Sequence, residues 1–138
     1  MNPLINCNTS QKSGIFASFL ALSKLEEGFH EEVFSFIMII AKEIDFNWND
    51  PSFSHVLGKL GLESSENERL SILKTLDEKQ KKHMVMLLYV QVEIAPMDGD
   101  YMGKRLYPAE LAKNIGLSND IATTLQKEAI RYYLNMIY

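Results

Sequence analysis

Two stretches of this sequence are apolar nearly all round a helix, and they constrain the fold more than any other feature. The first runs from Val33 to Ala41 inside segment 29–44, and the second is segment 83–95. A helix without a polar face is normally buried among other helices. No stretch alternates with the two-residue period of a half-buried strand. We therefore expect an all-α bundle with these two helices at its centre.

Residues typical of helix starts and helix ends divide the chain into about seven helices. Asp50 with Pro51, and later Pro108, are typical of helix starts, whereas Gly61 and Gly116, each followed by leucine, are typical of helix ends. Further N-terminal caps are expected at Ser65, Asp77 and Ser118. The expected helices span residues 14–25, 29–44, 49–62, 65–76, 77–95, 108–115 and 118–137.

Size and charge exclude several classes of protein. The 138 residues, 46% apolar and 23% charged, fit one globular domain over 1–138. A net charge of -4 gives no general attraction to phosphate backbones, so we expect no nucleic-acid partner. The longest apolar run, Met84 to Ala95, is too short to span a bilayer. Cys7 is the single cysteine and the N-terminus lacks a signal pattern, so we expect a cytoplasmic protein.

Segment 95–112, APMDGDYMGKRLYPAELA, is the passage where the helical pattern breaks and acidic residues gather around two glycines. Asp98, Asp100 and Gly103 occupy positions 1, 3 and 6 of an EF-hand loop. Position 5 is a methionine, however, and Glu110 falls one residue late, so a regular EF-hand is not expected. A looser site formed by Asp98, Asp100, Glu110 and backbone carbonyls would suit calcium, magnesium or manganese.

A simpler interpretation of the same segment needs no metal. The segment is then a hydrophilic turn in which Gly99 permits a positive φ, and Glu110 complements the dipole of a helix that begins at Pro108. Lys104 and Arg105 could themselves offset the repulsion between the carboxylates. Both interpretations place a loop before Pro108.

These residues also carry a family resemblance. The matching residues are Ala95, Asp98, Gly99, Glu110, Leu111, Gly116, Leu117 and Ser118, with Ala41, Asp45, Leu57, Leu60, Gly61 and Leu62 in an earlier copy of the pattern. The chain thereby resembles the TerB-like family associated with tellurite resistance, over about residues 29–128. The resemblance implies an all-helical cytoplasmic domain that binds a divalent metal or a partner. The chain departs from the family in the twelve positions between Asp98 and Glu110, in lacking glycine after Asp45, and in His55 at the place of Glu110.

The sequence therefore predicts a non-catalytic interaction or scaffold module, with a protein partner or a second copy as its ligand. No catalytic residue and no cofactor besides a possible divalent cation is predicted. The alternative is a metal-dependent hydrolase that uses Asp98 and Glu110, although no further nucleophile or base accompanies them. For an interaction module, we expect a partly exposed aromatic surface that includes Tyr101, Tyr107, Tyr132 and Tyr138.

Overall fold

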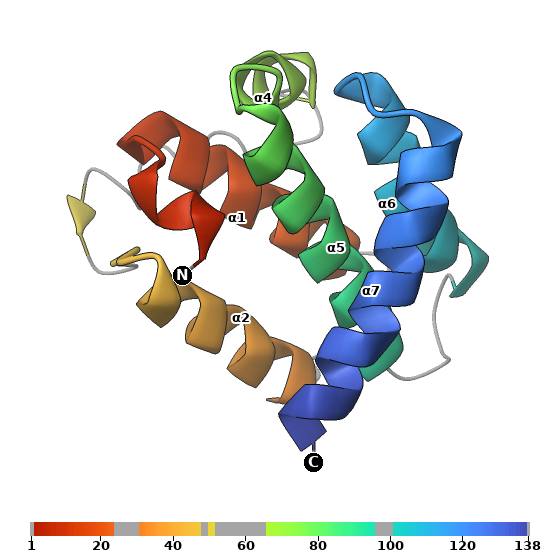
Figure 1. Ribbon diagram of the computed structural model, residues 1–138. Coiled ribbons are helices and arrows are strands. Elements are labelled where there is room, and N and C mark those ends of the chain that lie inside the picture. Colours follow the sequence, from red (N-terminus) through yellow and green to blue (C-terminus); the bar gives the residue numbers. More distant parts are fainter. Residues whose placement is uncertain (1, 24–30, 48–49, 52–65, 96–100, 138) are drawn as a thin grey trace.

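The computed structural model describes residues 2–23, 31–47, 50–51, 66–95 and 101–137 (Figure 1). Its elements are η1 (Pro3–Asn6), a short 3-10 helix, and α1 (Thr9–Ser23), α2 (Glu31–Glu43), α4 (Glu66–Leu73), α5 (Glu78–Ile94), α6 (Tyr101–Asn114) and α7 (Asn119–Ile137). Across these ranges there is no β-strand, which confirms the all-helical class. Nor is any helix there long and apolar enough to cross a membrane. The helix expected over 49–62 lies almost wholly outside the described residues.

Helix α5 is the central element, as its apolar sequence predicted. Every residue from Met84 to Gln91 is buried. Figure 1 shows α6 and α7 on one side of α5, with α1 and α2 on the other, and α5 contacts all four. Its start is fixed by a capping box. The Asp77 carboxylate accepts a hydrogen bond from the Gln80 backbone N–H, and the Gln80 side-chain oxygen accepts one from the Asp77 backbone N–H.

Helix α2 was also expected at the centre, and that prediction is wrong. It buries one face, which includes Phe36 and Ile40, against the core. On the opposite face, Met38 is 37% exposed and Ile39 is 52% exposed. An apolar sequence therefore marks a central helix in α5 but a peripheral one in α2, where the outer apolar face remains at the surface.

Helix α1 begins earlier than the expected residue 14. Asn8 and Gln11 form a reciprocal capping box, with hydrogen bonds of 2.9 and 2.8 Å, so the helix starts at Thr9. Gly14 then lies inside the helix, facing α4. A Cβ atom at Gly14 would lie 3.3 Å from Ile72, so the glycine allows close approach of the two helices.

The segment before Pro108 is helical, which corrects the expected loop. Helix α6 already begins at Tyr101 and contains Pro108 in its interior. Pro108, Leu111 and Ala112 are buried and Tyr107 is half-buried, so one face of the helix packs against the core. Packing of this face stabilises a helix that the proline alone would disfavour.

Two helices end in the same way. The amide of Phe46 donates to the Ala41 carbonyl at 2.8 Å after α2, and the amide of Leu117 donates to the Ala112 carbonyl at the same distance after α6. Between them lies a residue of positive φ, Asp45 at 58° and Gly116 at 96°. Both ends are Schellman motifs, which satisfy the last carbonyls of each helix.

Candidate functional site

The predicted cation ligands are only partly within the described residues. Asp98 and Asp100 lie outside them. Glu110 is exposed on α6, nine residues after Tyr101, which corresponds to about 13 Å along a helix. Among the described residues, no three His, Cys, Asp or Glu side chains come together to hold a metal ion. The cation site therefore stays a prediction from the sequence.

Glu110 instead has neighbours from α4 and its own helix. It lines a small cavity of about 60 Å³ together with Glu66, Arg69 and Tyr107. Arg69 is only 6% exposed. The Tyr107 hydroxyl is buried near Arg69 and Ser18 but reaches normal hydrogen-bond geometry with neither, and burial raises the pKa of this hydroxyl. The cluster links α1, α4 and α6, and its buried polar groups indicate a structural role.

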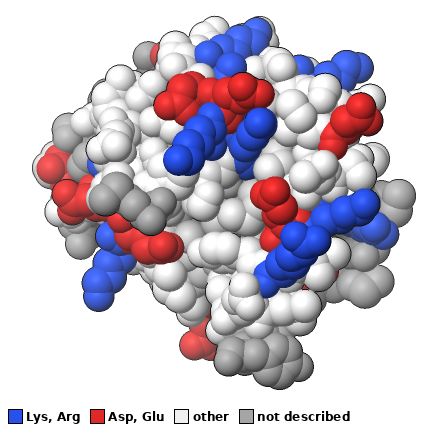
Figure 2. Space-filling model, viewed as in Figure 1, with Lys and Arg blue, Asp and Glu red and all other residues white. Residues whose placement is uncertain are grey.

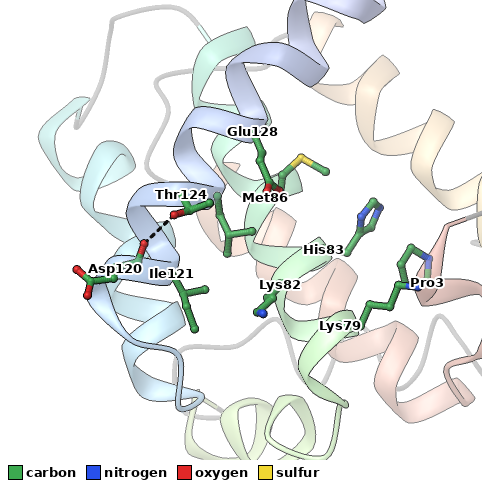
Figure 3. A pocket seen from close by; sticks show the side chains of 10 residues that line it. Pro3, Lys79, Lys82, His83, Met86, Asp120, Ile121, Thr124 and Glu128 are labelled. Carbon is green, nitrogen blue, oxygen red and sulfur yellow. Dashed lines mark hydrogen bonds between the residues drawn. The ribbon is translucent and has the colours of Figure 1, made fainter.

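A groove of about 400 Å³ lies between α5 and α7 (Figure 3). Its lining residues are Pro3 of η1, Lys79, Lys82, His83 and Met86 of α5, and Asp120, Ile121, Thr124, Leu125 and Glu128 of α7. Met86 and Leu125 are buried and form an apolar floor, whereas the charged residues form the rims. The volume is in the range of small-ligand sites.

Charge is unevenly distributed along this groove. Lys79 and Lys82 lie near the start of α5, and Figure 3 shows Glu128 near Met86, farther along. The Asp120 carboxylate points away from the other lining side chains, while its backbone carbonyl accepts a hydrogen bond from the Thr124 hydroxyl at 3.1 Å. The groove is thus lined by charged groups of both signs, with its lysines near the start of α5.

His83 stands on the α5 wall of the groove. Burial lowers the pKa of its imidazole, and the positive charge of the chain's N-terminus lowers that pKa further. The imidazole is therefore neutral near pH 7, when it can donate or accept a hydrogen bond.

Sequence reasoning missed the groove because its two walls lie about forty positions apart in the chain. The lysines between positions 79 and 82 and His83 belong to none of the sequence motifs described above. The available signal was the spacing of residues 79, 82, 83 and 86, which share one face of a helix. Nothing in the sequence alone pairs that face with α7.

A second feature is the apolar surface of α2 and α7. On α2 it comprises Phe34, Met38 and Ile39, and on the C-terminal part of α7 it comprises Ile130, Leu134 and Met136, each between 37% and 52% exposed. Figure 1 shows α2 and the C-terminal end of α7 at the same end of the molecule. Figure 2, from the same side as Figure 1, shows the charged side chains in separate groups with uncharged atoms between them. We call these six residues the α2–α7 surface.

Of the four tyrosines expected at a partly exposed surface, the structure describes the side chains of two. Tyr107 and Tyr132 are half-buried, and the pKa of Tyr132 is raised by burial and by the nearby Glu43 carboxylate. The side chain of Tyr101, and Tyr138 as a whole, lie outside the described residues. The exposed large apolar side chains described on α7 are thus Ile130, Leu134 and Met136, whereas Tyr132 and Tyr133 are half-buried.

Comparisons with protein families, curated proteins and solved structures found no match. The resemblance to TerB-like proteins stays a prediction from short sequence motifs.

Proposed function

We propose that the protein is a non-catalytic helical interaction module, and that its partner is a second copy of the same chain. The α2–α7 surface is the observation that carries this proposal. Its six large apolar side chains lie on two helices at one end of the molecule. Exposed apolar groups gathered in this way are typical of protein-binding surfaces.

Charge complementarity supports a second copy as the partner. On α2, the exposed Glu31 and Glu32 precede the apolar residues, while Lys127 and Arg131 are exposed beside the apolar residues of α7. In a two-fold dimer, α2 of each copy can contact α7 of the other, so acidic and basic groups meet twice. The contact is self-complementary in both charge and hydrophobicity.

The expected dimer is weak. The chain exposes 7730 Å², close to the roughly 7300 Å² expected for a folded monomer of this mass, so each copy already closes its own core. A standard interface buries roughly 800 Å² on each partner, more than six partly exposed side chains supply without their polar neighbours. We therefore expect association in the micromolar range or weaker.

Sedimentation velocity over a concentration series tests the proposal. The wild-type chain should shift from monomer towards dimer as concentration rises, and Leu134→Glu should remove the shift. Leu106→Glu is the matched control, because Leu106 is 50% exposed on α6, outside the α2–α7 surface. A monomer at every concentration, or equal weakening by both variants, would contradict self-association through this surface.

Two sequence-based proposals stand beside this one. Binding of a divalent cation by Asp98, Asp100 and Glu110 stays a prediction, as does the metal-dependent hydrolase that uses Asp98 and Glu110. Calorimetric titration with calcium, magnesium and manganese tests the cation, because a bound ion must also raise thermal stability. Unchanged binding in the double variant Asp98→Asn, Glu110→Gln would exclude these ligands.

A further inference from the structure

The groove between α5 and α7 combines an apolar floor with separated charges. Met86 is 7% exposed and Leu125 is 4% exposed at the floor, and Ile121 is half-buried beside them. An apolar side chain placed there would be removed from water on several sides. The floor therefore favours a ligand with at least one aliphatic or aromatic group.

The charges that line the groove do not neutralise one another. Within the described part of the chain, Lys79 and Glu128 form no ion pair, although both line the groove. Among the described residues, Lys82 forms an ion pair with Glu78 of its own helix, at 3.4 Å, and the two side chains are 41% and 68% exposed. An exposed pair of this kind contributes little, so Lys82 can exchange it for a ligand at small cost.

The spacing of groove residues along α5 sets the length of a suitable ligand. Met86 is four residues after Lys82 and seven after Lys79, which corresponds to roughly 6 and 10 Å along α5. Met86 belongs to the apolar floor, so the lysines and this floor lie about that far apart along the groove. An extended chain spans about 3.3–3.6 Å per residue, so two or three residues bridge this distance.

We propose that this groove binds a short peptide of two or three residues with both termini free. The peptide carboxylate lies at Lys79 and Lys82, near the positive end of the α5 dipole. The peptide ammonium lies at Glu128, and an apolar side chain contacts Met86 and Leu125. None of these five groove positions belongs to the α2–α7 surface, so this inference is independent of the proposed dimer.

Titration with the tripeptide Ala-Leu-Ala tests this inference. We expect binding by calorimetry, with NMR shifts of the His83, Met86 and Leu125 amides. Acetylating the amino end or amidating the carboxyl end removes one charge and should weaken binding about tenfold, as expected for one hydrogen bond to a charged group. No binding at about 10 mM peptide, or equal binding of the free and capped peptides, would overturn the proposal.

Variants of the chain locate the two ends of the ligand. Glu128→Gln should weaken the free peptide but leave the amino-acetylated peptide unchanged, because that peptide has no ammonium to lose. The double variant Lys79→Gln, Lys82→Gln should do the converse with the amidated peptide. Lys127→Gln is the control, since Lys127 is exposed beside Glu128 but does not line the groove. Equal losses in the control and in Glu128→Gln would show a general charge effect and overturn the site.

Discussion

Gln91 is a fully buried polar residue in the central helix, and its replacement by glutamate tests the packing of α1 on α5. Its side-chain nitrogen donates to the Phe19 carbonyl at 3.1 Å and to the Ser23 hydroxyl oxygen at 3.0 Å. Glutamate has the same shape, but an ionised carboxylate cannot donate to either oxygen. The folded chain would therefore hold this carboxyl protonated, with a pKa above its unfolded value.

The expected loss of stability depends on pH. Near pH 4 the carboxyl is largely protonated in both states, and one lost hydrogen bond costs about 1 kcal/mol. Above the unfolded pKa of about 4.3, the unfolded state loses a proton that the folded state retains, so stability falls as pH rises. Each pH unit above this pKa increases the loss of stability by as much as about 1.4 kcal/mol, so the total loss reaches roughly 4 to 5 kcal/mol near pH 7.

Urea unfolding followed by circular dichroism at several pH values measures this loss. Gln91→Met is the matched control, because it removes both hydrogen bonds that Gln91 donates without adding an ionisable group. The Ser23 hydroxyl still donates to the Phe19 carbonyl at 3.1 Å, so the control should lose only about 1 kcal/mol at every pH. Parallel pH profiles of the two variants would refute the buried contact of Gln91.

Three further predictions concern local features of the fold. Gly116 and Asp45 both have positive φ. Gly116→Ala should therefore lower the free energy of unfolding in urea by about 1–2 kcal/mol, whereas Asp45→Gly should raise it. No atom lies within 4 Å of a Cβ at Gly116, so the loss there comes from backbone conformation and not from a clash. Gly14→Val should cost about 1–3 kcal/mol by forcing α1 from Ile72 of α4, whereas Gly14→Ala should cost less because alanine favours the helix. Because burial lowers the His83 pKa, the unfolded state binds a proton first, so stability should fall as pH decreases below about 6.5. His83→Gln should reduce that decrease in a pH series of melting temperatures, and an unchanged profile would contradict the burial of His83.

Local signals in the sequence predicted several elements of the fold well. The start of α5 at Asp77, the end of α6 at Gly116 and the start of α7 at Ser118 all depend on contacts within a few residues. Ser118 accepts from the Ile121 amide at 3.2 Å, as a capping serine does. Such signals are complete in the local sequence, because the groups that satisfy each helix end are its own neighbours.

Features that depend on tertiary packing were not predicted. Pro108 looked like a helix start, but the buried face of α6 extends the helix back to Tyr101. The outer face of α2 is as apolar as a buried face, so periodicity alone could not place that helix at the periphery. The groove was missed for the same reason, since Met86 and Leu125 meet only after α5 and α7 pack together.

The central claim is that α2 of one copy contacts α7 of another, and a charge-reversal cycle measured by sedimentation equilibrium tests it most directly. Glu32 and Arg131 are exposed on the two helices. Glu32→Lys alone and Arg131→Glu alone should each weaken the dimer, because each brings like charges together across the contact. The double variant restores opposite charges and should recover most of the wild-type affinity. Additive weakening in the double variant, or a wild-type chain that remains monomeric, would contradict the claim.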